Sequence, residues 1–144
     1  MKKIKSTKGF TIIEALIVLA IIGAIMLILF LAVPALRRNQ RNTTRKNDVA
    51  SLLAAVNEYA ANNNGANPAA ASDITSISKV SYYGTADVAL ASGAQTAITT
   101  DTVKIVTGAK CGASGATVAG SSRQIAAQYM TEVGSTLTAT CQDS

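Results

Sequence analysis

Hydrophobic and polar positions divide the chain into an apolar stretch near the N-terminus, a polar junction, an amphipathic stretch and a C-terminal part with short apolar runs. Nineteen consecutive residues, Ala15 to Val33, carry no charge and no strongly polar side chain. As a helix this run would extend roughly 28 Å, which is close to the hydrocarbon thickness of a bilayer. The pattern therefore predicts a helix that can span a membrane.

Cleavage after the apolar run, as in a secretory signal peptide, is disfavoured. Such peptides have an apolar region of about 7 to 15 residues followed by a small-residue cleavage site. Here the run is longer and ends in Val33-Pro34-Ala35-Leu36, directly before a group of arginines.

Beyond the polar junction, an apolar stripe with helical spacing begins near Asp48, which could cap a new helix. The stripe consists of Val49, Leu52, Leu53, Val56 and Tyr59. Asn42, Thr43 and Thr44 are mediocre helix formers, so the sequence allows a break there. Asn62 to Gly65 favours a helix end. We expect helix from Phe10 to about Ala61.

The C-terminal part predicts short strands separated by glycine and serine. The expected strands are Lys79 to Tyr83, Val103 to Thr107, Gln124 to Glu132 and Leu137 to Cys141. Ala69 to Ser78 is undecided between a loop and a short helix. An antiparallel meander packed on the C-terminal half of the helix would cover the stripe, which gives an α+β fold.

Composition argues against several kinds of enzyme. The chain has no histidine, which removes Ser-His-Asp and Cys-His arrangements and the commonest metal ligand. We find no phosphate loop or pair of catalytic carboxylates, and expect neither an enzyme nor a cofactor. A calcium site is less favoured than solvated surface for the aspartates Asp73, Asp87, Asp101 and Asp143. The sequon Asn42-Thr43-Thr44 is interpreted as incidental.

The chain has a net charge of +5, and most of its 13 basic residues form two clusters that flank the apolar run. They are Lys2, Lys3, Lys5 and Lys8 before it, and Arg37, Arg38, Arg41, Arg45 and Lys46 after it. Membrane topology and headgroup attraction explain both clusters. DNA capture by residues 37–46 is the alternative.

Glu14 does not fit an ordinary membrane anchor. A carboxylate inside a span costs on the order of 3 kcal/mol by insertion scales. The residue therefore either lies in the headgroup region or is paired with a specific cation.

The N-terminal segment reads KKIKSTKGFTIIEALIVLAIIGAI: a lysine-rich leader, Gly9, Phe10 and then Glu14 at the start of the apolar helix. It resembles the leader and N-terminus of type IV pilins and pseudopilins. The resemblance implies cleavage between Gly9 and Phe10 by a prepilin peptidase and methylation of the new Phe10 amine. It also implies that Glu14 pairs with the Phe10 amine of a neighbouring subunit.

A helix kink near Gly23 to Pro34 is expected as well. Gly23 matches a glycine of the family, whereas Pro34 lies three residues beyond the family's usual proline. Since proline removes one helical hydrogen bond, the kink is expected even with this departure.

The resemblance implies four parts: a cleaved leader (1–9), a transmembrane or filament-core helix (10–36), the amphipathic second half of the helix (37–64) and a β-rich head (65–144). The expected function is the major pilin of a type IV pilus that serves adhesion, twitching motility or DNA uptake. Alternatives are a type II secretion pseudopilin, a minor pilin, or a membrane-anchored domain that binds DNA or another ligand. The implied partners are further copies, the peptidase, the assembly platform with its ATPase, and DNA or a surface receptor. The precursor would lie in the inner membrane and the product outside the cell.

Cys111 and Cys141 are the only cysteines. An even pair beyond a membrane segment, in a domain with few large core residues, favours a disulfide. Two free buried thiols are the alternative. Pilins often have a C-terminal disulfide loop, which adds to the case.

Overall fold

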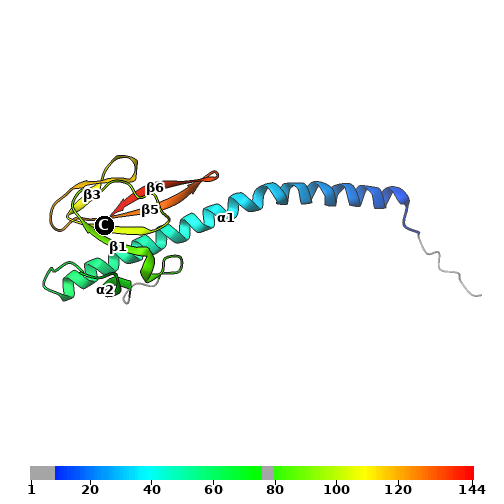
Figure 1. Cartoon of the computed structure of the whole chain (residues 1–144). Helices are drawn as coiled ribbons and strands as arrows, with labels where there is room; N and C mark the ends of the chain where they lie inside the picture. Colours follow the sequence, from blue (N-terminus) through cyan, green and yellow to red (C-terminus); the bar gives the residue numbers. More distant parts are fainter. Residues whose placement is uncertain (1–8, 76–79) are drawn as a thin grey trace, which may run out of the picture. The chain divides into compact units, whose positions relative to one another are not determined.

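The computed structural model describes residues 9–75 and 80–144. They form two compact units: an N-terminal unit up to Arg37 and a C-terminal unit from Arg38 to Ser144. The first long helix, α1, comprises Ile12–Asn62 and contributes to both units (Figure 1). The remaining elements are α2 (Ala71–Thr75), β1 (Val88–Ser92), β2 (Val103–Thr107), β3 (Ala109–Cys111), β4 (Thr117–Ala119), β5 (Ile125–Val133) and β6 (Thr136–Asp143), with 3₁₀ turns η1 (Thr85–Asp87) and η2 (Ala113–Gly115).

Helix α1 continues through the junction where the sequence allowed a break. The hydroxyls of Thr43 and Thr44 donate to the carbonyls of Asn39 and Gln40, 2.9 and 3.0 Å away. These bonds satisfy the two hydroxyls inside the helix. The helix ends as expected, with Asn64 and Gly65 in left-handed conformations and the Gly65 N–H donating to Ala60.

The C-terminal unit contains a four-stranded sheet in the order β1-β2-β5-β6, so the α+β fold is confirmed. β5 is antiparallel to both of its neighbours. β1 and β2 are parallel, which differs from the expected meander. Residues 93–102 cause the difference, because they cross the sheet before β2 begins, and Thr96 accepts a hydrogen bond from Gln128 of β5 on the way.

The expected strands were only partly right. β2 matches its prediction, and β5 and β6 match theirs to within two residues at each end. Val80 to Tyr83 is not a strand, and Lys79 lies outside the described residues. The sequence did not indicate β1, β3 or β4. The undecided stretch contains the short helix α2, while its residues 76–78 are outside the described part of the chain.

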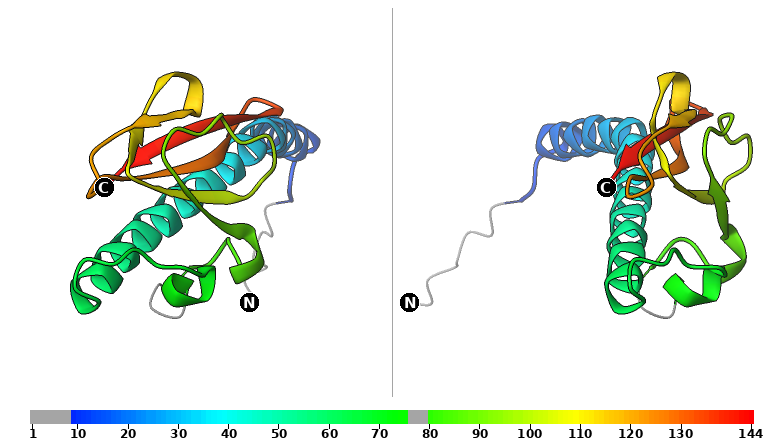
Figure 2. Two further views of the ribbon diagram at one scale, coloured as in Figure 1. Left: turned by 60° about the vertical axis from the view of Figure 1, so that its left-hand side comes forward. Right: turned by 90° about the vertical axis from the view of Figure 1, so that its left-hand side faces the viewer.

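The main core lies between the sheet and the part of α1 after Arg38 (Figure 2). Val49, Leu52 and Val56 of the predicted stripe are fully buried there. They share one cluster with Ile105 of β2 and Tyr129 of β5. The amphipathic pattern thus gave the correct face of the helix.

Beyond the main core, β3 and η2 contact β5 and β6 of the sheet, and β4 pairs with β3. Buried Gln128 donates to Gly115 of η2, 2.9 Å away. A Cβ on Gly115 would lie 2.6 Å from the backbone of Ala139 in β6, and Gly115 has φ +76°. Only glycine fits this close approach of η2 to β6.

Candidate processing and assembly site

Gly9 and Phe10 form an exposed, non-helical segment immediately before α1. A Cβ placed on Gly9 would have no heavy atom within 4 Å, so the chain itself does not require glycine there. The leader residues before Gly9 lie outside the described residues.

Thr11 and Glu14 form a capping box at the start of α1. The Thr11 N–H donates to Oε2 of Glu14 at 2.8 Å, and the Glu14 N–H donates to the Thr11 hydroxyl at 3.3 Å. The Thr11 hydroxyl also donates to Glu14 Oε2 at 2.7 Å. This reciprocal pattern satisfies N–H groups that the first helical turn leaves unpaired. The T-x-x-E pattern of residues 11–14 predicts such a capping box, which is missed when Glu14 is considered only as a charge.

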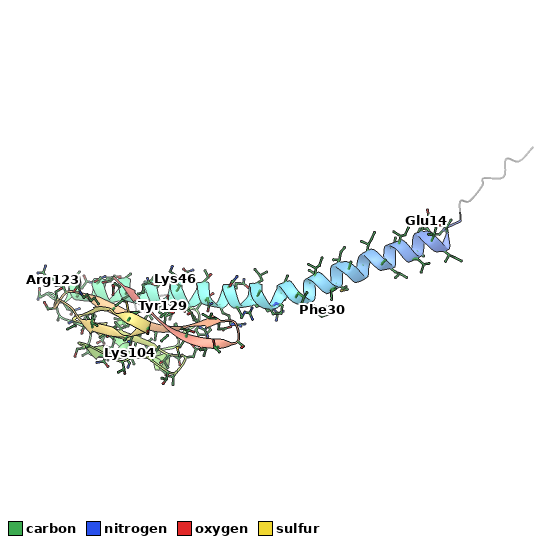
Figure 3. The ribbon with its side chains drawn as sticks, turned by 90° about the horizontal axis from the view of Figure 1, so that it is seen from above. Glu14, Phe30, Lys46, Lys104, Arg123 and Tyr129 are labelled. Carbon is green, nitrogen blue, oxygen red and sulfur yellow. A yellow bond between two sulfur atoms is a disulfide. The ribbon has the colours of Figure 1, made fainter. Side chains whose placement is uncertain are left out.

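Capping uses only one of the two carboxylate oxygens of Glu14. Both bonds to its carboxylate reach Oε2, while Oε1 has no hydrogen bond to residues 9–75 or 80–144. The box holds the carboxylate at the exposed end of the helix, where Figure 3 shows it.

The N-terminal unit presents a mostly apolar surface. Every Ile, Leu, Val, Phe and Met side chain from Phe10 to Leu36 is exposed, and Phe30 reaches 77% (Figure 3). The helix has a mean hydropathy of 3.3 in its most apolar window and is long enough to cross a membrane. Gly23 and Pro34 lie within it, and the kink near them stays a prediction. Such a surface needs lipid or protein to cover it.

Two of the five residues of the second basic cluster, Arg41 and Arg45, form ion pairs inside the C-terminal unit. Arg45 is only 2% exposed and forms ion pairs with Asp101 (2.6 Å) and Glu132 (3.1 Å). Its guanidinium also lies 4.5 Å from the centre of the Tyr82 ring. Arg41 pairs with the same Glu132 through both of its carboxylate oxygens. These contacts hold α1 to three segments that are distant in sequence.

Asn42 takes the place of a neighbouring strand beside the end of β5. Its amide donates to the Glu132 carbonyl at 2.9 Å, and its side-chain oxygen accepts the Glu132 N–H at 2.8 Å. The paired residues of β2 and β5 end at Lys104 and Gln128, so these backbone groups have no strand partner on that side. A glycan on Asn42 would break this clamp.

The sequence allowed Asp48 to cap a new helix, but Asp48 lies inside the continuous helix α1. It is 3% exposed and accepts the backbone N–H groups of Ser81 (2.9 Å) and Tyr82. It thus fixes the segment that had been expected to form a strand.

The electrostatics of the junction follow from these contacts. The Arg41 guanidinium lowers the pKa of the Glu132 carboxyl. Burial raises the pKa of Tyr82 and Tyr83. Glu132 is therefore held as a carboxylate and the two phenols stay protonated.

Cys111 of β3 and Cys141 of β6 form a disulfide with Cα atoms 5.6 Å apart. The four aspartates considered for calcium serve separate local purposes. Asp73 caps α2, Asp87 accepts the Gly84 N–H, Asp101 binds Arg45, and Asp143 accepts the Cys111 N–H at 2.6 Å.

Comparison with protein families finds one match, the prokaryotic N-terminal methylation motif, over residues 4–30. Searches of curated proteins and of solved structures give no match. The matched range contains the Gly9–Phe10 bond, the capping box and most of the exposed apolar run. The chain therefore carries a type IV pilin-like prepilin signal at the start of its long apolar helix.

Proposed function

We propose that the chain is the major structural subunit of an extracellular type IV pilus. A prepilin peptidase cuts between Gly9 and Phe10, the Phe10 amine is methylated, and the mature chains polymerise through α1. The observation that carries this proposal is the methylation motif at the start of a helix whose large apolar side chains are all exposed as far as Leu36. The chain acts as a building block and not as a catalyst.

The apolar surface alone cannot drive assembly from the membrane. In the precursor stage lipid covers these side chains, and lipid tails are as apolar as a neighbouring helix. Packing and electrostatic contacts must therefore favour the filament, and an ATP-driven assembly machine supplies the work of extraction. The free Oε1 of Glu14 is the group that accepts the Phe10 ammonium of a neighbour, because two unpaired charges in an apolar filament core are costly.

DNA capture by the second basic cluster has less support than the sequence suggested. Arg41 and Arg45 are occupied by acidic partners within the same unit. Only the remaining members of the cluster could offer their charge to phosphates. Adhesion, motility or DNA uptake would then be properties of the filament as a whole.

Mass spectrometry of sheared filaments tests the proposal. We expect the dominant subunit to begin at Phe10, to carry one methyl group and to lack the leader. Gly9→Leu should accumulate as precursor, whereas Gly23→Ala, at another glycine with open space for a Cβ, should be processed normally.

A mature N-terminus beyond Val33 would contradict the pilin reading. A subunit that begins at Phe10 but is scarce in the filaments would instead indicate a minor pilin or a pseudopilin.

A further inference from the structure

The turn between β5 and β6 has an exposed apolar tip. Val133 is 60% and Leu137 45% exposed. The register pairs Val133 with Thr136 and Glu132 with Leu137, so the two apolar side chains lie on opposite faces of the hairpin. Gly134, with φ +63°, and Ser135 form the two-residue turn and add little bulk. The tip is thus apolar on both sides.

The tip lies at the N-terminal end of the part of α1 that belongs to the same unit. Ile125, at the start of β5, lines a groove with Asn57 and Ala60 near the end of the helix. Glu132, near the end of β5, binds Arg41 and Asn42. β5 therefore runs antiparallel to α1 (Figures 1 and 2), and the turn that follows Glu132 lies near Arg41.

The tip itself is uncharged, and Arg38 of α1 adds to the same unit a positive charge that is unpaired within the described part of the chain. Residues 133–138 carry no charge, and the carboxylate of Glu132 is paired with Arg41 and Arg45. Arg38, one helical turn before Arg41, has no ion pair among the described residues. The surface thus combines apolar side chains with unneutralised cationic charge, a combination that suits anionic lipid headgroups.

We propose that the β5–β6 tip enters the headgroup layer of the membrane that holds the precursor, with Arg38 bound to lipid phosphates. The proposal rests on the membrane-anchored state proposed above. Arg38 follows Val33, the last residue of the apolar run, by only five positions, which places it where residues that flank a span meet headgroups. A flat protein partner would cover one face of the hairpin, whereas entry by the tip covers both.

This contact gives the C-terminal unit a second attachment to the bilayer. The tip would have to leave the lipid when the subunit is extracted into a filament. The assembly machinery therefore works against two attachments, the apolar helix and the hairpin tip.

Tryptophan fluorescence can test the contact, because the chain contains no tryptophan. Three single-tryptophan variants of the full chain are placed in bilayers of phosphatidylcholine and phosphatidylglycerol, with or without brominated acyl chains. Leu137→Trp reports the tip and Leu27→Trp reports the apolar run. Val118→Trp is the matched control, because Val118 is similarly exposed (42%) but lies away from the tip. It belongs to β4, which pairs with β3, and the disulfide joins β3 to the end of β6 that is opposite the tip.

We expect the brominated lipid to reduce the emission of Leu137→Trp about twofold and to leave Val118→Trp unchanged, because interfacial side chains reach the acyl boundary. Adding Arg38→Gln to Leu137→Trp should weaken the quenching, and more so in bilayers rich in phosphatidylglycerol.

Quenching of Leu27→Trp without quenching of Leu137→Trp would overturn the proposal while leaving the anchored state intact. A blue-shifted but unquenched Leu137→Trp would indicate that a second copy covers the tip, and would also overturn it. An unquenched Leu27→Trp would remove the anchored state itself and this proposal with it.

Discussion

The carboxylate of Glu14 has one oxygen in the helix cap and a second oxygen that we propose for the ion pair between subunits. Oε2 closes the capping box with Thr11, and Oε1 is free among the described residues. A valine at this position would remove both the cap and the carboxylate charge. A loss of filaments in Glu14→Val therefore does not distinguish a frayed helix start from a missing ion pair. Glutamine separates the two, since it can still close a capping box but cannot pair with an ammonium as a charge.

We expect Glu14→Val and Glu14→Gln both to be cleaved and to enter the membrane at least as well as the wild type. Removing the carboxylate removes a charge that is unfavourable to insert into a bilayer. Both variants should nevertheless fail to form filaments, because the Phe10 ammonium of an incoming subunit would be left unpaired. Counting surface filaments at matched levels of processed protein measures this.

Thr11→Ser is the control for the cap, because serine retains the hydroxyl that accepts the Glu14 N–H; its filament count should be normal. Abundant filaments from Glu14→Gln would indicate that hydrogen bonding, and not charge, is what assembly requires of this residue.

At the scale of the elements, sequence reasoning succeeded where a single element determines the pattern. The buried stripe of α1, the helix end at Asn62 and strand β2 follow from local periodicity and turn chemistry. The three-residue strands β3 and β4 are too short to carry a period, and the parallel pairing of β1 depends on a crossover that composition does not specify.

The site was predictable to a similar extent. The cleavage segment was visible as a motif, but the contacts of Arg45, Asn42 and Asp48 join positions more than 30 residues apart. The sequence does not distinguish a polar helix residue that faces solvent from one that forms a tertiary contact. Asn42 was therefore interpreted as an incidental sequon, and Arg45 as one of five flanking charges.

The contact between α1 and β5 should make the C-terminal unit sensitive to acid. Because the pKa of Glu132 is lowered in the folded state, its contribution to stability is full above the unfolded pKa and is lost as pH falls through the folded pKa. Glu132→Gln should cost about 2 kcal/mol of unfolding free energy at neutral pH, since hydrogen bonds to charged groups are lost. The difference from wild type should shrink below the ordinary pKa of 4.5.

Urea unfolding of the full chain in detergent, at neutral and at acid pH, measures both values. The control is Glu58→Gln, which changes an exposed glutamate of the same helix and should alter stability little. A cost of Glu132→Gln that stays constant with pH would contradict the ion-pair account.

The two units of the molecule depend on different surroundings. The N-terminal unit leaves its apolar side chains uncovered, so it requires lipid or other copies. The C-terminal unit has its own buried core and a disulfide, so it can remain folded while the surroundings of the helix change. This division suits a subunit that moves from a membrane into an extracellular filament.

The disulfide should contribute strongly to the persistence of the C-terminal unit outside the cell. It connects β3 of the small sheet to β6 of the large one across 30 residues, and Asp143 binds the Cys111 N–H beside it. In the chain-entropy model, closing such a loop stabilises the folded state by roughly 3 to 4 kcal/mol. The double variant Cys111→Ser, Cys141→Ser should lose about this much unfolding free energy in the full chain, because its unfolded state regains the freedom of that loop.

Hydrogen exchange should rise in β3, β4 and β6 and stay low at Leu52 and Val56, whose partners in the core are untouched. Reduction of the wild type should reproduce the loss, and the double variant should not respond to reductant. Wild-type protein from outside the cell whose two thiols both react with a maleimide without denaturation would refute the bridge, and the stability of this unit would then have to come from the packing of α1 on the sheet alone.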